Sequence, residues 1–279
     1  MSEERRLDVA LVHGGLARSR GQAKDLVDRR LVTIDGVPAT KVSQRVRADQ
    51  LLQVLGDDAR WVSRSAHKLV GAFDAFAGSA PAGQAGAGWR VEGLRCLDLG
   101  ACTGGFTQVL LDRGAAHVVA LDVGHDQLAG ELRADPRVTD LSGVTVRGLS
   151  PGDIGGPVDR IVADLSFISL RLALPSVRRC LLPGGQAVLL VKPQFEVGRA
   201  RLSKHGVVGS AAARHDALVG VLTSAGEEGL AVLGLERSPI TGGEGNREYL
   251  LWLAAASDVG MSWQAQTETV RAVTTQEDH

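Results

Sequence analysis

The sequence predicts an α/β protein in which a doubly wound, mostly parallel sheet follows a small α+β domain. From residue 94 onward, short apolar stretches alternate with helical patterns, which is typical of parallel βαβ units. Residues 1–70 form a different, basic segment with 13 Lys/Arg and 9 Asp/Glu, whereas the remaining residues hold 18 and 23. A basic front on an acidic body favours an anionic partner for the N-terminal segment.

The small domain is expected over residues 1–58. Two short helical patterns open it, the first ending at Gly14 and the second beginning after Ser19 as its N-cap. An alternating stretch then turns at Asp35-Gly36, a dipeptide that favours a tight hairpin. Residues 59–64 are the expected linker to the larger domain.

The larger domain is expected over residues 65–260, followed by a polar tail at 261–279, of which residues 267–279 are expected to be frayed. A helix at 66–76 comes first, and a Gly/Ala/Pro loop at 77–88 separates it from the sheet. The expected strands, of which the last is antiparallel, are 94–99, 117–122, 143–147, 158–163, 186–191, 230–236 and 247–253. The expected helices are 104–113, 125–133, 170–181 and 211–228.

A glycine-rich turn, "CLDLGACTGGFT", follows the first strand of this sheet, at the edge where open α/β sheets bind ligands. Cys102 stands where a dinucleotide fingerprint has its second glycine, and a carboxylate at Asp98 repels phosphate but suits an ammonium or sulfonium group. Asp122 ends the next strand, where it suits ribose hydroxyls. These features favour S-adenosylmethionine, while a nicotinamide nucleotide, or a turn that binds nothing, stays open. The expected cofactor-binding residues are Asp98, Gly100, Cys102, Thr103, Gly104, Phe106, Asp122 and Asp164.

Four charged residues stand where expected strands or helices meet the ligand-binding edge. Lys192 directly follows the apolar stretch "AVLLV", Asp164 follows another strand, Glu248 opens the last strand and Lys68 precedes the sheet. If the last strand is antiparallel, all four lie beside the glycine-rich turn. Each has an ordinary alternative: a lysine that extends to water, an aspartate that caps a helix, or a surface ion pair. Their shared expected location favours a functional site.

Motifs along most of the chain, about residues 5–254, resemble signatures of the TlyA (hemolysin A-like) family of ribosomal RNA 2′-O-methyltransferases. The stretch "GLARSRGQAKDLVDRRLVTIDG" resembles the family's S4 motif. The family's FtsJ/RrmJ-like methyltransferase domain has signature segments that are similar to five stretches of this sequence: "WVSRSAHKL", "LDLGACTGGFT", "VADLSFISL", "LLVKPQFEVGR" and "GNREYLLWL". Ser65 replaces a usual glycine, and "GHDQL" replaces a usual G-Y-x-Q-L. The stretch "GLSPGDI" lacks a clear acidic residue, so the contacts to adenine stay open.

The resemblance implies a Rossmann-like, S-adenosylmethionine-dependent methyltransferase sheet joined to an S4-like domain. It further implies an enzyme that methylates cytidine 2′-hydroxyls of 16S ribosomal RNA, 23S ribosomal RNA or both. The family's Lys-Asp-Lys-Glu tetrad falls on Lys68, Asp164, Lys192 and Glu248. We expect Lys192 nearest the hydroxyl and the other three orienting it. Two roles stay open for Lys192: accepting the proton, or stabilising the developing alkoxide.

The resemblance also favours RNA binding by the basic N-terminal domain and by a basic loop after Lys192. The expected RNA-binding residues are Arg5, Arg6, Arg18, Arg20, Lys24, Arg64, Arg199 and Lys204. An RNA-binding protein with an idle methyltransferase fold, a membrane-active hemolysin and a nicotinamide dehydrogenase are the alternatives.

Composition limits the other function classes. No apolar run approaches the roughly 20 residues that span a bilayer, and the N-terminus does not resemble a signal peptide. The three cysteines lack paired spacing, and no Cys/His pattern suggests zinc. We therefore expect a cytoplasmic protein without a metal, a membrane or a stable protein partner, and the family resemblance implies ribosomal RNA or ribosomal subunits as its partner.

Overall fold

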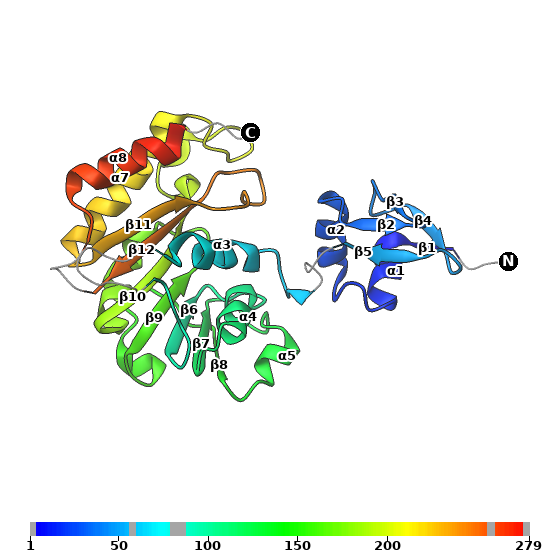
Figure 1. The fold of residues 1–279 in the computed structure, drawn as a ribbon, viewed down its shortest axis with the longest axis horizontal. Helices are drawn as coiled ribbons and strands as arrows, with labels where there is room; N and C mark the ends of the chain where they lie inside the picture. The colour runs from blue at the N-terminus through cyan, green and yellow to red at the C-terminus, as the bar shows by residue number, and fades with distance from the viewer. Residues whose placement is uncertain (1–3, 56–59, 79–87, 256–259, 276–279) are drawn as a thin grey trace. The chain divides into compact units, whose positions relative to one another are not determined.

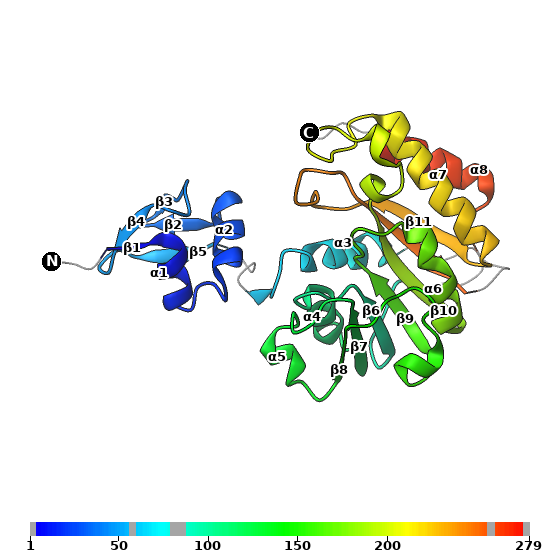
Figure 2. The same ribbon diagram turned by 180° about the vertical axis from the view of Figure 1, so that it is seen from behind.

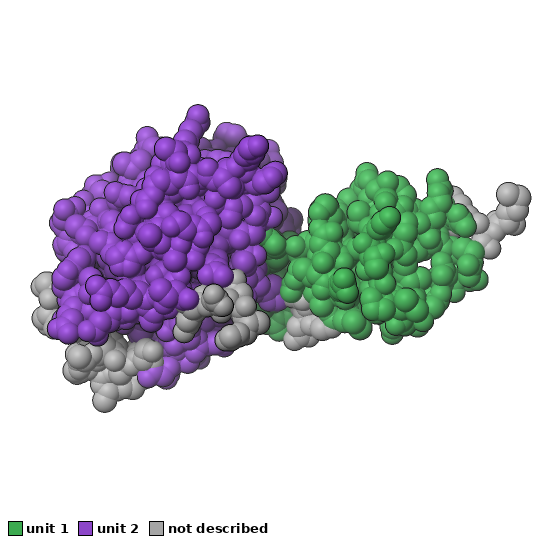
Figure 3. All heavy atoms as spheres, turned by 90° about the horizontal axis from the view of Figure 1, so that it is seen from above, with its two compact units in different colours: residues 1–66 green, residues 67–279 purple. Residues whose placement is uncertain are grey.

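The computed structural model describes residues 4–55, 60–78, 88–255 and 260–275. The chain divides into two compact units, residues 1–66 and residues 67–279, which are coloured separately in Figure 3. Most of the expected Gly/Ala/Pro loop lies outside the described residues, as does the first residue of the expected linker.

The first unit is a small α+β module around a core of aliphatic side chains that includes Leu7, Leu11 and Leu26. The Ser19 side chain accepts a hydrogen bond from the Gln22 amide, so the expected N-cap is confirmed. The expected hairpin is also confirmed: Asp35 and Gly36 both have positive φ between two paired strands. The elements are β1 (Glu4–Arg6), α1 (Leu7–His13), α2 (Arg20–Asp28), β2 (Val32–Ile34), β3 (Val37–Pro38), β4 (Arg45–Arg47) and β5 (Leu52–Val54). Strand β1 pairs with β4, and β2 lies between β3 and β5.

The second unit is built on one sheet, whose strands follow the order β11-β12-β10-β9-β6-β7-β8 within the described residues. Strand β12 is antiparallel to both of its neighbours, and the other pairs are parallel. The expected doubly wound sheet with an antiparallel last strand is therefore confirmed. The strands are β6 (Arg95–Leu99), β7 (His117–Asp122), β8 (Val138–Ser142), β9 (Val158–Ala163), β10 (Leu181–Val191), β11 (Ala231–Arg237) and β12 (Tyr249–Ala254).

Helices cover both faces of this sheet, and side chains alternate between the two layers along each strand. Residues such as Leu97, Leu99 and Leu189 pack into the core beneath α6, α7 and α8, which Figure 2 shows on one side. On the other side, Trp252 stacks against Phe76 of α3, and α4 packs on β6 and β7 (Figure 1). The helices are α3 (Ala66–Phe76), α4 (Gly105–Asp112), α5 (Gly130–Arg133), α6 (Leu174–Cys180), α7 (Ala211–Glu227) and α8 (Trp263–Thr275).

The expected strand at 143–147 is wrong, because the preceding residues Val138–Ser142 form β8 instead. Gly143 has a φ of 77°, a left-handed conformation that ends the strand. The Val144 amide then donates to the Asp122 carbonyl, so residues 144–147 turn away from the sheet toward the end of β7. Residues 144–147 alternate apolar and polar residues and residues 138–142 do not, so alternation favoured the stretch that the left-handed Gly143 excludes from the sheet.

Two helices also differ from expectation. The expected helix at 125–133 shortens to α5, because Asp126 has positive φ and the stretch before α5 is a loop. The expected frayed tail is wrong for residues 267–275, which belong to α8. Val270 and Val273 of α8 are buried against the core, and Arg214 donates to the Thr274 carbonyl at its last turn. These two valines, three residues apart, indicated a helix with one buried face, but the mostly polar composition of the tail favoured a frayed segment.

A glycine in α3 allows this helix to lie close to Pro239, which follows β11. A Cβ atom built on Gly71 would lie 2.6 Å from Cγ of Pro239, whereas one on Gly226 in α7 would meet nothing within 4 Å. Alanine is favoured over glycine in a helix by about 1 kcal/mol, but overpacking costs about 1–3 kcal/mol. We therefore expect Gly71→Ala to lower the free energy of unfolding and Gly226→Ala to raise it. Urea unfolding of both variants measures this, and equal shifts of one sign would contradict the packing argument.

Candidate active site

Two cavities open at the carboxyl edge of the parallel strands in the second unit. The first, which we call the loop cavity, has a volume of about 660 Å³ and borders the glycine-rich turn, Asp122 and residues 144–147. The second, the lysine cavity, has about 700 Å³ and borders Lys68, Lys192 and Glu248. Both are lined by Ser166–Ile168, the segment that follows β9. This segment therefore forms a wall that is common to both cavities.

The glycine-rich turn is held tightly to the two neighbouring strand ends. Gly100 has a φ of 81°, and a Cβ there would lie 2.9 Å from the Asp164 carbonyl oxygen, so only glycine fits. The Asp122 carboxylate accepts the amides of Cys102 and Gly124, each at 2.8 Å. This carboxylate thereby fixes the turn and still has lone pairs at the cavity wall for hydroxyl donors.

Asp98 is fully buried beneath the turn. Its Oδ2 atom accepts from Thr107 at 2.7 Å, while Oδ1 has no hydrogen-bond partner among the described residues. Burial raises the pKa of this carboxyl to about 7, with a smaller upward contribution from Asp164, although the Thr107 hydrogen bond opposes the shift. An unpaired buried carboxylate is costly, which is why this carboxyl keeps its proton up to about pH 7.

The four charged residues expected at the sheet edge form a continuous chain of ion pairs. Lys68 Nζ lies 2.7 Å from Glu248 Oε2 and 3.3 Å from Asp164 Oδ2. Lys192 Nζ lies 2.6 Å from Asp164 Oδ1. By distance these are ion pairs, although neither Glu248 Oε2 nor Asp164 Oδ1 accepts a hydrogen bond of regular angle. The antiparallel direction of β12 brings Glu248 to this edge, as the sequence predicts.

Burial makes these charges dependent on one another. Lys68, Lys192 and Glu248 are only 6%, 8% and 4% exposed, so removing one partner leaves an uncompensated charge away from water. Burial raises the pKa of Asp164, but the ammonium groups of Lys68 and Lys192 outweigh it and hold the pKa below its usual range. Asp164 is therefore ionised near neutral pH and keeps the two lysines in place.

Two residues of this site escaped the sequence analysis. Ser166 accepts a hydrogen bond from Lys192 Nζ at 2.9 Å. Glu196 accepts from the Ser169 hydroxyl and the Leu170 amide, both at 2.6 Å, and so ties the segment after β10 to the segment after β9. The signal for Glu196 was available, because it is an acidic residue four positions after Lys192 in a motif already singled out.

The expected cofactor residues divide into two groups. Gly100, Cys102, Asp122 and Asp164 line the loop cavity. The other four, Asp98, Thr103, Gly104 and Phe106, are not among its lining residues. Gly104 instead permits close packing, since a Cβ there would lie 2.3 Å from Leu132, and Phe106 is buried in the layer of α4.

The expected RNA-binding residues are divided between the two units and differ in their contacts. Arg6 and Arg20 both contact Asp8, whereas Arg5 points to the other face of β1 and lines a separate cavity of about 430 Å³. Lys24 pairs with Asp28 and Arg64 with Asp25, and Arg18 donates to the Arg60 carbonyl. In the second unit, Arg199 lines the lysine cavity, and Lys204 lies in the exposed segment beside it.

The fold and this site define the class: a methyltransferase-type sheet with a lysine and carboxylate centre at its carboxyl edge. Residues 61–255 match the family model described as FtsJ-like methyltransferase, and residues 5–52 match the S4 domain. The chain therefore belongs to the FtsJ-like methyltransferase family, and to its TlyA branch with an N-terminal S4 domain. The family resemblance drawn from the motifs is confirmed.

Relatives of similar length carry two kinds of name. A 16S/23S rRNA (cytidine-2′-O)-methyltransferase TlyA of Mycobacterium tuberculosis is 48% identical over 97% of this chain and 97% of its own length. A hemolysin A of Brachyspira hyodysenteriae is 34% identical over 88% of this chain and 98% of its own. The solved structure of a hemolysin-named protein of Streptococcus thermophilus shares 35% identity, with a TM-score of 0.74 over 98% of this chain and 96% of its own. Among the described residues of this chain, no helix has the length and apolar character needed to span a membrane.

The raised pKa of Asp98 predicts a specific pH dependence of stability. The folded state keeps a proton on Asp98 between about pH 4 and pH 7 that the unfolded chain releases, so this contribution is complete below about pH 4 and is lost as the pH rises through about 7. We expect Asp98→Asn to gain stability over wild type across this window, by up to about 4 kcal/mol at pH 8.

Unfolding by urea at several pH values measures the effect. Asp74→Asn, which removes an exposed carboxylate from α3, is the matched control and is expected to follow the wild-type curve. If the free energy of unfolding depended on pH in the same way for wild type and Asp98→Asn, the Asp98 carboxyl would be ionised in the folded protein at acidic pH, and the prediction would be wrong.

Proposed function

We propose that this chain is an S-adenosylmethionine-dependent methyltransferase that modifies cytidine 2′-hydroxyls of ribosomal RNA. One observation carries the proposal: Lys192 Nζ is held by Asp164 and Ser166, in the segment where the loop cavity and the lysine cavity meet. A group at this point can act on an acceptor in one cavity while a methyl donor occupies the other.

The loop cavity fits S-adenosylmethionine better than a dinucleotide. Asp122 offers carboxylate oxygens for ribose hydroxyls, and the buried Asp98 carboxyl suits a nearby cationic group rather than a phosphate. Cys102 carries a side chain where a dinucleotide fingerprint needs glycine for the pyrophosphate. When bound, S-adenosylmethionine supplies a methyl group activated by its sulfonium. Residues 144–147, which line the same cavity, are the proposed wall for the adenine.

Lys192 is proposed to act on the acceptor hydroxyl. An ammonium group has three N–H donors, and contacts to Asp164 and Ser166 leave one for a substrate oxygen. Lys68 and Glu248 act through Asp164, since they fix the carboxylate that fixes Lys192. Lys192 can accept the proton or stabilise the developing oxyanion only if its nitrogen lies at the hydroxyl. Both roles therefore require that Asp164 and Ser166 hold the Lys192 nitrogen in place.

An exposed aromatic side chain offers a surface for the target base. Phe167 is 92% exposed, lines both cavities and has its ring centroid 5.4 Å from that of Phe195. Its φ of 63° is unusual for a bulky residue, and such strain occurs where function holds a side chain outward. A base taken out of its stack is commonly held on an aromatic ring, and we assign this role to Phe167.

The S4 unit is proposed to supply most of the RNA affinity through arginine contacts to phosphates. The relative from Mycobacterium tuberculosis is named for both 16S and 23S RNA, so both ribosomal subunits are proposed substrates. Ribosomal subunits occupy the cytoplasm, which is accordingly the proposed location of this protein.

Replacing Lys192 tests the proposed role directly. We expect Lys192→Ala to lower methyl transfer to undermethylated 30S and 50S subunits by about 100-fold or more, because general acid–base groups typically contribute 10²–10⁴-fold. Transfer of tritium from methyl-labelled S-adenosylmethionine to rRNA measures the rate. Lys192→Arg separates the two roles, since guanidinium cannot accept a proton near neutral pH but can stabilise an oxyanion.

The matched control is Arg137→Ala, which removes a surface cation paired with Asp135 and is expected to keep wild-type activity. Equal transfer by wild type and Lys192→Ala would remove Lys192 from the mechanism. No transfer by wild type to either subunit, with RNA binding intact, would favour a binding protein with an idle methyltransferase fold.

A further inference from the structure

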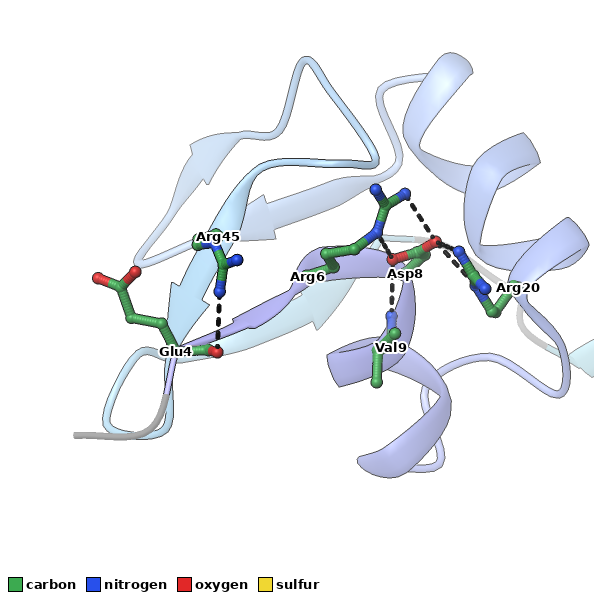
Figure 4. A network of polar contacts seen from close by, with 6 residues as sticks. All are labelled: Glu4, Arg6, Asp8, Val9, Arg20 and Arg45. Atoms are coloured by element: carbon green, nitrogen blue, oxygen red, sulfur yellow. Dashed lines mark hydrogen bonds and ion pairs between the residues drawn. The ribbon is translucent and has the colours of Figure 1, made fainter.

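A buried carboxylate holds two arginines on one face of the S4 unit. Asp8, at the start of α1, is 3% exposed. It accepts from Arg6 Nε at 3.0 Å and Arg6 Nη2 at 3.1 Å, and from Arg20 Nε and Nη2 at 2.9 and 2.8 Å. The Val9 amide donates to it as well, at 3.0 Å. Figure 4 shows the Asp8 carboxylate between the two guanidinium groups.

The two arginines remain available to a ligand despite these contacts. Their side chains are 45% and 65% exposed, against 5% for that of Asp8. A guanidinium has five N–H donors, and each arginine contacts Asp8 through Nε and one terminal nitrogen. The other terminal nitrogen of each arginine does not contact Asp8. Because each guanidinium is planar, the contact through Nε and Nη2 also fixes the direction in which this outer nitrogen points.

A third arginine adjoins this pair. Strands β1 and β4 are antiparallel, with Arg6 directly opposite Arg45, and opposite residues of such a pair extend from the same face. Like charges in this arrangement destabilise a sheet. Arg45 is exposed, and Figure 4 shows it on the side of Arg6 away from Asp8, where its guanidinium donates to the Glu4 carbonyl at 3.5 Å. An anion bound across this face would relieve the repulsion between them.

We propose that Asp8 is a positioning residue for RNA: it holds Arg6 and Arg20 with their outer donors ready for backbone phosphates, and Arg45 extends the same phosphate-binding face. This inference rests on the proposed function for its ligand. A free arginine must be ordered when it binds, whereas a guanidinium already clamped by a carboxylate loses less freedom per hydrogen bond formed. The two forks also match phosphate geometry.

The sign of one substitution separates this proposal from simple electrostatics. Asp8 carries a negative charge in a module that binds a polyanion, so charge alone predicts that Asp8→Asn tightens RNA binding. Positioning predicts the opposite, because the amide cannot accept from both guanidinium groups as the carboxylate does. Asp8→Glu keeps the charge but moves the carboxylate by one methylene, and positioning predicts weaker binding there too.

The experiment measures equilibrium binding of the full chain to purified 30S and 50S subunits, assayed separately. We expect Asp8→Asn and Asp8→Glu each to weaken binding at least about fivefold and to lower the slope of log K against log[KCl], between about 50 and about 200 mM, by about 1–2 units. The matched control is Asp49→Asn, which removes a carboxylate contacted by Arg47 where both side chains are exposed. Its binding is expected to stay the same or tighten.

Further variants keep the test decisive if Asp8→Asn unfolds the module, which thermal unfolding would reveal. Arg6→Ala and Arg20→Ala are each expected to weaken binding, and in the Asp8→Glu background each is expected to cost less. No loss of affinity in either arginine variant, or tighter binding by a folded Asp8→Asn protein, would overturn the proposal.

Methyl transfer distinguishes this proposal from the proposed function. At saturating subunits, Asp8→Glu is expected to retain the wild-type kcat with a raised KM. If wild type binds subunits but transfers no methyl group, the enzymatic proposal fails while the binding comparison still decides the role of Asp8.

Discussion

The site depends on one carboxylate shared by two ammonium groups. Asp164 lies 2.6 Å from Lys192 and 3.3 Å from Lys68, and these lysines come from segments far apart in the chain. Without it the two buried lysines would repel each other, Lys192 would lack a counter-ion and Lys68 would keep only Glu248. Their attraction holds the pKa of Asp164 low against the opposing effect of burial. The positions of α3, the segment after β9 and the segment after β10 are thus coupled through a single side chain.

The sheet supplies the geometry that makes this sharing possible. Parallel strands β9 and β10 end side by side, so Asp164 and Lys192 become neighbours, and antiparallel β12 begins at the same edge with Glu248. Gly100 extends the coupling to the other cavity, because its missing Cβ lets the glycine-rich turn contact the Asp164 backbone. The residue that orders the lysines therefore also borders the proposed donor site. A substitution or a bound molecule that moves Asp164 from one cavity therefore also changes the position of the side chains that line the other.

Both units use a buried aspartate to hold two cationic side chains, with different consequences. In the second unit the lysines are themselves buried, so their charges are directed at a small enclosed volume that suits a single hydroxyl. In the first unit the arginines paired with Asp8 remain largely exposed, and exposed planar donors suit the repeated phosphates of a nucleic acid. The cations are paired with an aspartate in both units. What distinguishes the candidate active site from the proposed RNA-binding face is that its cations are buried.

Local patterns in the sequence were sufficient for much of this protein. The alternation of apolar stretches and helical patterns determined the doubly wound sheet, the Ser19 cap and Asp35-Gly36 turn determined local structure, and the positions of Lys192, Asp164 and Glu248 at strand ends indicated a shared edge. These features depend on residues near one another in the chain or on the rule that parallel strands end together. The motif resemblance placed Lys68, which no periodicity singles out.

Tertiary structure decided what local patterns leave open or point to wrongly. Residues 144–147 alternate and residues 138–142 do not, yet Gly143 and the hydrogen bonds from residues 143 and 144 to the end of β7 decided that the earlier stretch pairs. The tail became helix α8 because the core offered an apolar surface to Val270 and Val273. Likewise Ser166 and Asp8 gained their roles only from partners brought close by folding, because a hydroxyl or a buried aspartate has no distinctive sequence pattern until its contacts exist. Glu196 stands in a motif that the sequence singled out, but folding decided that its partners are Ser169 and Leu170.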